Sequence, residues 1–249
     1  MLAALALIGT SPAVVTEFVD YIEKREKITT LRIVATRADQ VVSGALLAAE
    51  AVRYRYPWIK ASVDTLPLSD VTNEDENYVF MEELVNVIKS IKSSDAERIY
   101  LCLAGGRKEM AVAAVLVAQI MGLNAVYHVL SHNIRKANVE LERIRDKIKE
   151  LASSKDPGEY YARNAELFEK VMYPSPDTYN VIKIPILPYP RETLDTLRNI
   201  MSNEAPQERA LSRELLDKLV EAGIVTRCCG KILVTEEGLR FYRHVLEHV

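Results

Sequence analysis

Apolar runs alternate with segments of helical period along the first half of the chain. The runs are short and apolar throughout, as expected for strands that are covered on both faces of a parallel sheet. The segments between them carry apolar residues at helical spacing, which predicts helices. The predicted strands are 2–8, 31–36, 60–66, 98–104 and 124–130, and the predicted helices are 12–24, 41–56, 76–92 and 108–121.

Strands that alternate with helices of these lengths form parallel βαβ units. The predicted fold class is therefore α/β, with a Rossmann-like, doubly wound, mainly parallel sheet. The pattern changes after Ser131. From there the sequence predicts a charged helix over 133–153, a helix over 160–171, a strand over 179–187 and a helix over 191–201.

The last part of the chain has a different organisation. Residues 203–207 are a candidate linker, so we expect one domain over 1–202 and a smaller one over 203–249. A helix over 211–222, a short hairpin in GIVTRCCGKILVT and a helix over 238–247 follow, with Thr235 as the predicted N-cap. This order of elements predicts a small winged-helix domain.

Composition limits the possible partners. A net charge of -3 over 249 residues provides no global field for nucleic acid or an anionic membrane, so any anion site must be local. The apolar run 2–8 is too short to span a bilayer and lacks the basic start of a signal peptide. The three cysteines suggest neither a metal site nor a disulfide framework. We expect a cytoplasmic protein with no membrane segment, no metal and no cofactor.

Candidate chemistry lies in the loops after the strands, because ligands of doubly wound sheets bind beyond the carboxyl ends of the strands. The first loop is Gly9-Thr10-Ser11-Pro12, where Ser11 is the expected N-cap of the following helix. Backbone N–H groups and two hydroxyls at a helix N-terminus suit a phosphate.

The fourth strand is followed by Gly105-Gly106-Arg107-Lys108. The glycines allow a ligand to approach the backbone, and two cations at the start of a helix are unfavourable unless an anion compensates them. The spacing matches neither a dinucleotide-binding nor a P-loop motif. Further ligand contacts are expected at the same edge of the sheet from Arg37, Ser131, His132 and Asn133.

Two of these loops carry a family resemblance. LIGTSPAVVTEFVDYI, together with LAGGRKEMAVAA and VYHVLS, resembles the CRISPR-associated Rossmann fold (CARF), and above all its ring nucleases. The resemblance covers about residues 1–190, and the C-terminal module is similar to one found in archaeal ring nucleases.

The resemblance implies a homodimer that binds cyclic tetra-adenylate across its two-fold axis. It further implies metal-independent cleavage by a ribose 2′-hydroxyl to linear di-adenylate with a 2′,3′-cyclic phosphate, which ends antiviral signalling. The implied catalytic residues are Ser11, Arg107 and a lysine after the fifth strand, for which Lys170 is the first choice and Lys136 and Lys155 are the alternatives.

Three other functions remain open. The protein could be a sensor that binds the ring without cutting it and regulates transcription through the winged helix. Residues 205–249 hold seven cations and seven anions, which makes DNA binding unfavourable and a dimerisation or lid role more favourable. Arg243 and His248 match the spacing of a HEPN ribonuclease motif, but too few residues remain for that helical domain. An ordinary nucleotide-binding α/β protein would leave the paired loops unexplained.

Overall fold

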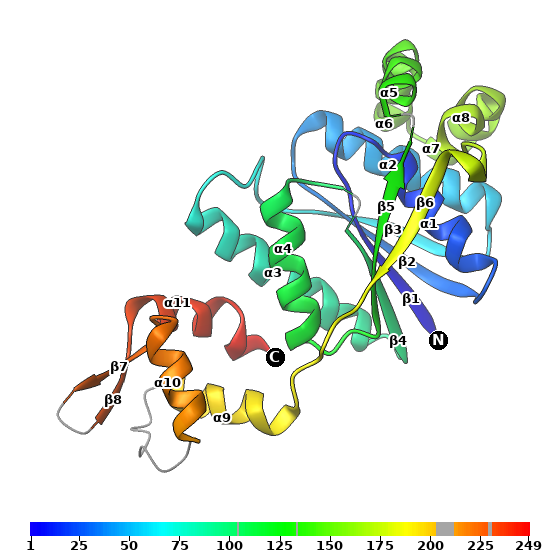
Figure 1. The fold of residues 1–249 in the computed structure, drawn as a ribbon. Coiled ribbons are helices and arrows are strands. Elements are labelled where there is room, and N and C mark those ends of the chain that lie inside the picture. Colours follow the sequence, from blue (N-terminus) through cyan, green and yellow to red (C-terminus); the bar gives the residue numbers. More distant parts are fainter. Residues whose placement is uncertain (104, 133, 203–211, 229–230) are drawn as a thin grey trace.

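One six-stranded sheet forms the centre of the molecule (Figure 1). The computed structural model describes residues 1–103, 105–132, 134–202, 212–228 and 231–249. The strand order is β3-β2-β1-β4-β5-β6, in which β1 to β5 are parallel and β6 is antiparallel to β5. The α/β fold with a mainly parallel sheet is therefore confirmed. The strands are β1 (Leu2–Leu7), β2 (Ile28–Ala35), β3 (Lys60–Thr65), β4 (Arg98–Cys102), β5 (Ala125–Ser131) and β6 (Tyr179–Ile184).

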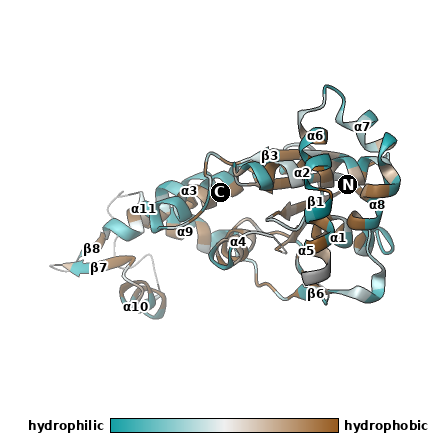
Figure 2. Cartoon of the chain, turned by 90° about the horizontal axis from the view of Figure 1, so that it is seen from above, coloured by the Kyte–Doolittle hydropathy of each residue, from teal (hydrophilic) through white to brown (hydrophobic). Residues whose placement is uncertain are grey.

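Helices cover both faces of this sheet, so each strand contributes to two cores. Along β1, Ala4 and Ala6 belong to one buried cluster, whereas Leu5 and Leu7 belong to the other. This division explains why the strand is apolar at every position. One face carries α1 (Ala13–Glu23) and α2 (Asp39–Arg55), and the other carries α3 (Glu74–Lys92), α4 (Lys108–Ile120) and α9 (Arg191–Met201). Figure 2 shows the two layers from above.

A helical insertion between β5 and β6 packs beside α1 and α2 (Figure 1). The sequence predicted two helices here, over 133–153 and 160–171, and the structure corrects both. Each is broken, at Ile144 and at Asn164, where the backbone leaves helical geometry. Ile144 is buried in the core, and the Asn164 side-chain amide donates to the Tyr160 carbonyl. The helices are α5 (Ile134–Arg143), α6 (Arg145–Ser153), α7 (Pro157–Arg163) and α8 (Ala165–Met172), followed by the 3-10 turn η1 (Pro176–Thr178).

The C-terminal elements match the predicted order of helix, hairpin and helix. They are α10 (Arg213–Glu221), β7 (Val225–Cys228), β8 (Lys231–Val234), α11 (Glu236–His244) and the 3-10 turn η3 (Leu246–His248). The Thr235 hydroxyl accepts from the Gly238 N–H at 3.1 Å, which confirms the predicted N-cap. Val245 and Leu246 are buried in the core that also contains α3. The linker 203–207 lies outside the described residues, so the domain boundary and the winged-helix assignment stay predictions.

Two loops meet backbone to backbone at the centre of the sheet. The chain proceeds from β1 to β2 on one side and returns to β4 on the other, so the loops after β1 and β4 lie together at the switch point. A Cβ atom on Gly105 would lie 2.4 Å from backbone atoms of Leu7, Ile8 and Gly9. Gly106 has φ 87°, in the left-handed region. Only glycine permits this approach.

The first prediction tests this close approach. Gly105→Ala should lower the free energy of unfolding by about 2–3 kcal/mol, because the new methyl group clashes with backbone that cannot move aside easily. Gly158→Ala is the matched control, since its Cβ would lie 3.5 Å from side-chain oxygens only. Urea denaturation of both variants measures the difference. Equal stability of the two variants would show that the loops adjust freely.

A second prediction concerns Glu17 in α1. Its side chain is 4% exposed, and its Oε2 has no hydrogen-bond partner among the described residues. Burial raises the pKa of this carboxyl to about 7 from the ordinary value of 4.5. Between these two values the native state holds a proton that the unfolded chain has lost. The free energy of unfolding therefore falls as the pH rises from 4.5 to 7, by about 3 kcal/mol.

Glu17→Gln should remove this pH dependence. The free energy of unfolding of the variant should therefore increase relative to that of the wild type as the pH rises from 5 to 7.5. Urea denaturation at both pH values measures the gain. Glu221→Gln, at an exposed position on α10, should follow the wild type. An unchanged slope in Glu17→Gln would mean that Glu17 is ionised in the folded protein.

Candidate functional site

The loop after β1 presents its hydroxyls at the carboxyl edge of the sheet. Thr10 is exposed, and Ser11 is half-buried. The expectation that Ser11 caps the next helix is wrong: α1 begins at Ala13, Pro12 occupies the N-cap position, and no side chain caps it. The Ser11 hydroxyl instead lies 3.5 Å from the Asn138 Oδ1 of α5, at the limit of a hydrogen bond. Ser11 is therefore held only loosely by the protein.

The loop after β4 places Arg107 at the N-cap position of α4, as an exposed side chain. The guanidinium forms a bidentate ion pair with Asp70, in which the Arg107 Nε donates to the Asp70 Oδ1 at 2.7 Å. This contact holds the pKa of the Asp70 carboxyl below its usual range. The sequence predicted that a bound anion would compensate Arg107. In the structure a carboxylate from the loop before α3 does so, which no spacing in the sequence indicated.

The other two predicted cations of this edge differ in their contacts. Lys108 is exposed in the first turn of α4. Arg37 is exposed after β2, and its guanidinium donates to the Pro67 carbonyl, while its backbone N–H donates to the Leu68 carbonyl at 2.7 Å. Arg37 therefore joins the loops after β2 and β3, and this structural role competes with ligand binding.

The loop after β5 lies at the same edge, because β5 is parallel to β4. Ser131 is the last residue of β5 and pairs with Tyr179 of β6. His132 is exposed, and its backbone N–H donates to the Thr178 carbonyl at 2.8 Å. Asn133 lies outside the described residues.

Lys170 is not brought into contact with these loops by any interaction of the described residues. It lies on α8, 70% exposed, and forms an ion pair with Glu166 one turn earlier, at 3.1 Å. Lys155 is exposed between α6 and α7. The geometry therefore gives Lys170 no direct support, and its catalytic role stays a prediction.

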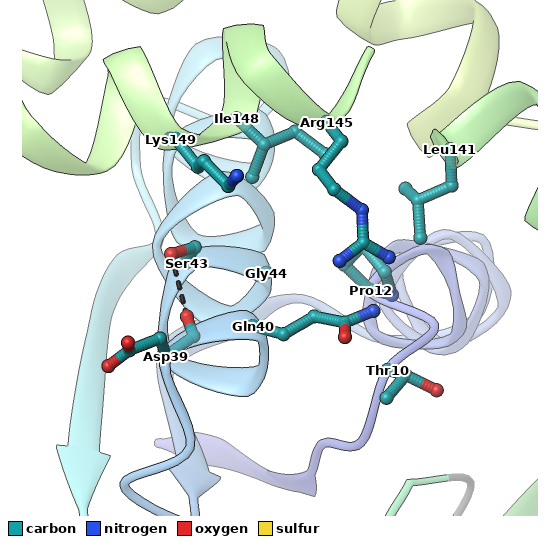
Figure 3. A pocket seen from close by; sticks show the side chains of 10 residues that line it. All are labelled: Thr10, Pro12, Asp39, Gln40, Ser43, Gly44, Leu141, Arg145, Ile148 and Lys149. Carbon is teal, nitrogen blue, oxygen red and sulfur yellow. Dashed lines mark hydrogen bonds between the residues drawn. The ribbon is translucent and has the colours of Figure 1, made fainter. Parts of the chain in front are cut away.

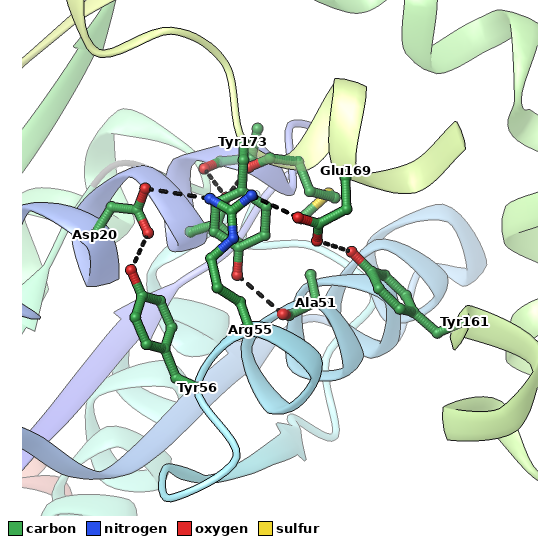
Figure 4. Close-up of polar contacts among 10 residues, drawn as sticks. Asp20, Ala51, Arg55, Tyr56, Tyr161, Glu169 and Tyr173 are labelled. Atoms are coloured by element: carbon green, nitrogen blue, oxygen red, sulfur yellow. Dashed lines mark hydrogen bonds and ion pairs between the residues drawn. The ribbon is translucent and has the colours of Figure 1, made fainter. Parts of the chain in front are cut away.

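A partly exposed arginine connects α8 to α1 and α2 (Figure 4). Arg55, at the last turn of α2, pairs with Glu169 of α8 and lies 3.6 Å from Asp20 of α1. Its guanidinium carbon lies 3.3 Å from the centre of the Tyr173 ring. Burial raises the pKa of Tyr173, which donates its proton to the Ala51 carbonyl at 2.9 Å. This network is structural, and it ties the insertion to α1 and α2.

A pocket opens next to the first loop, between the starts of α1 and α2 and the helix α6 (Figure 3). Its volume is about 170 Å³. The side chains of Arg145 and Lys149 reach toward it from α6, and Gln40 reaches across it from α2. The lining residues are Thr10, Pro12, Asp39, Gln40, Ser43, Gly44, Leu141, Arg145, Ile148 and Lys149.

The pocket residues of α2 and α6 were not predicted from the sequence. Arg145 and Lys149 are four residues apart, as are Leu141 and Arg145, so one face of the charged segment could have been recognised from spacing alone. Nothing in the sequence indicated that this face lies over Thr10.

The charges around the pocket are balanced within the protein. Arg145 forms a bidentate ion pair with Glu142, and Lys149 lies 3.9 Å from Asp146. Asp39 adds a carboxylate to the rim. Within the part of the chain that the structure describes, no three His, Cys, Asp or Glu side chains gather as metal ligands, and no helix is long and apolar enough to cross a membrane.

The family model of the CRISPR-associated protein NE0113 matches residues 11–219. Over 164 residues the chain is 27% identical to the CRISPR system ring nuclease SSO2081 of Saccharolobus solfataricus, covering 64% of this chain and 86% of that protein.

Solved structures give more distant matches. Csm6 of Enterococcus italicus, bound to cyclic hexa-2'-fluoro-hexa-dAMP, is 14% identical with a TM-score of 0.46, covering 90% of this chain and 55% of that one. Can2 of Sulfobacillus thermosulfidooxidans, in complex with cyclic tetra-adenylate, is 11% identical with a TM-score of 0.36, covering 97% and 63%. The chain thus spans about three fifths of these structures, and the likeness concerns the fold alone.

The family model covers most of the chain, including the serine of the first loop and the Gly-Gly-Arg-Lys loop. The chain therefore belongs to the family of the CRISPR-associated protein NE0113, and its resemblance to the CARF ring nucleases is confirmed.

Proposed function

We propose that this protein binds cyclic tetra-adenylate at the carboxyl edge of its sheet and cleaves it, ending a CRISPR antiviral signal. The observation that carries the proposal is the similarity to a ring nuclease over 64% of the chain. The meeting of the two glycine loops supports it, since these loops bring Ser11 and Arg107 to the switch point where such sheets bind ligands.

The proposed reaction is a metal-independent transesterification. A ribose 2′-hydroxyl oxygen attacks the adjacent phosphorus, the bond from phosphorus to the 5′-oxygen breaks, and the hydroxyl proton ends on that leaving oxygen. Each cut leaves a 2′,3′-cyclic phosphate and a 5′-hydroxyl without consuming water. Two cuts convert the ring of four nucleotides into two linear di-adenylates.

The protein would accelerate this reaction by alignment and by charge stabilisation. Ser11, which caps no helix, is available to hold the phosphate or the ribose beside the start of α1. Arg107 would stabilise the negative charge on the non-bridging phosphate oxygens, and it must then share its guanidinium with Asp70.

A lysine would assist these two residues. Lys170 is the choice that the family resemblance favours, whereas its exposed ion pair with Glu166 gives it no tie to the loops. Lys149 is an alternative because it lines the pocket next to Thr10. The two lysines can be separated by experiment.

A homodimer is part of the proposal. A ring of four identical nucleotides can have two-fold symmetry, and an isologous dimer would present the same loops to both halves. Each protomer would supply its Ser11 and its Arg107 to one half of the ring.

The competing role is a sensor that acts on DNA through the C-terminal elements. Their charges are balanced, and Arg240 of α11 is paired with Glu74 and Asp75 of α3. His244 also contacts Glu82 of α3 at 2.6 Å. Because these side chains are engaged within the chain, we propose that DNA binding is not a function of this module.

A cleavage assay in EDTA tests the proposed function. Wild-type protein should convert labelled cyclic tetra-adenylate to di-adenylate cyclic phosphate, and Ser11→Ala should slow this by about 10²-fold or more, because one positioning group is lost. Ser94→Ala, at an exposed serine after α3, should leave the rate unchanged. Lys149→Ala and Lys170→Ala, run in parallel, identify the assisting lysine.

Tight binding without cleavage would contradict the proposed nuclease activity and favour the role of a sensor. Cleavage that needs an added divalent ion would contradict the metal-independent mechanism. Absence of binding would contradict both functions.

The salt dependence of binding tests Arg107 as a phosphate ligand. Arg107→Ala should weaken binding of cyclic tetra-adenylate by about tenfold or more and reduce the slope of log K against log salt by about 0.7 for each lost phosphate contact. Arg227→Ala removes another exposed arginine that is paired with an aspartate, Asp217, and should change neither quantity. An unchanged slope in Arg107→Ala would remove Arg107 from the phosphate site.

A further inference from the structure

We propose that the pocket between α1, α2 and α6 binds one adenine base of the ligand, and that Gln40 makes this subsite select adenine. The inference rests on the proposed function and adds to it the group that discriminates between rings of different bases.

The size and walls of the pocket suit a base better than a whole nucleotide. Its volume of about 170 Å³ lies below the range of about 300–1,000 Å³ that holds larger ligands. Pro12 and Ile148 are buried, and Leu141 is half-buried, so these side chains form an apolar lining. A Cβ on Gly44 would already lie 3.6 Å from the Pro12 ring, so α1 and α2 are in close contact at this point.

Gln40 supplies the group that can read the base. Gln40 is an exposed residue, and its side chain extends across the pocket in Figure 3. A glutamine amide can accept from the N6 amine of adenine and donate to N7 at the same time. Hypoxanthine carries an oxygen in place of that amine, so it would lose this pairing.

Arg145 faces Gln40 across the pocket (Figure 3). Glu142 holds its guanidinium in a bidentate ion pair, which limits the directions that the planar group can take. Guanidinium planes stack on unpaired bases. Gln40 would therefore contact the edge of the base while Arg145 contacts its face.

A phosphate is the alternative occupant, and the charge balance is against it. Arg145 is neutralised by Glu142, Lys149 has Asp146 at 3.9 Å, and Asp39 lies on the rim. An uncharged ring with hydrogen-bonding edges is a better match for such a pocket than an anion.

The subsite is continuous with the proposed phosphate loop. Thr10 lines the pocket, and Ser11 follows it in the loop after β1. A nucleotide whose phosphate lies at Ser11 can therefore direct its base between α2 and α6.

Equilibrium binding of cyclic tetra-adenylate and cyclic tetra-inosinate tests the inference. The wild type should prefer the adenine ring by about tenfold or more. Gln40→Leu should bind both rings within about twofold of each other. Asn86→Leu makes the same kind of change at an exposed position on α3, on the other face of the sheet, and should keep the preference.

A second variant tests the cavity itself. Ile148→Trp should fill the pocket and weaken binding of both rings, with an unchanged melting temperature as the check on folding. A wild type that binds the two rings equally, or a Gln40→Leu variant that keeps the preference, would overturn the base subsite while the proposed function stands. A folded Ile148→Trp variant that binds normally would overturn it too. Failure of the wild type to bind either ring would overturn the proposed function and the subsite together.

Discussion

The loops after β1 and β4 lie backbone against backbone, and this contact fixes where the helices and side chains around the site begin. A doubly wound sheet changes direction between β1 and β4, and here the loops after these strands touch through Gly9 and Gly105. Because no side chain separates these loops, α1 and α4 begin close together. Ser11 and Arg107 therefore lie at the same edge of the sheet. A larger residue at Gly105 would separate the groups on which the proposed chemistry relies.

The helical insertion determines what surrounds that point. Its four helices are rich in charge, yet they bury Ile144, Tyr161 and Phe168 against the layer that contains α1 and α2. Arg55 of α2 connects α8 to α1 and α2 through contacts to Glu169, Asp20 and Tyr173. Because the far end of the insertion is anchored in this way, α6 is held beside the first turn of α2. The pocket next to Thr10 is the consequence.

Ion pairing within the chain moderates the positive charge of the site. At the proposed phosphate loop, Arg107 is held by Asp70 in an exposed ion pair. Such exposed pairs contribute little stability, so a strongly charged ligand can exchange them at small cost. The protein can thus keep a net charge of -3 and still offer a local anion site, with selectivity left to hydrogen bonds such as the one proposed for Gln40.

The α/β class, most strands of the sheet and the two glycine loops could be predicted from the sequence, because the spacing of apolar residues and the conformational freedom of glycine are local properties of the chain. The breaks at Ile144 and Asn164, the freedom of Ser11 from helix capping, the pairing of Arg107 with Asp70 and the pocket under α6 were decided by tertiary structure. Each of these joins segments distant in the chain or depends on what a residue is buried against. Local patterns carry no record of such contacts, since the packing of the whole core selects them.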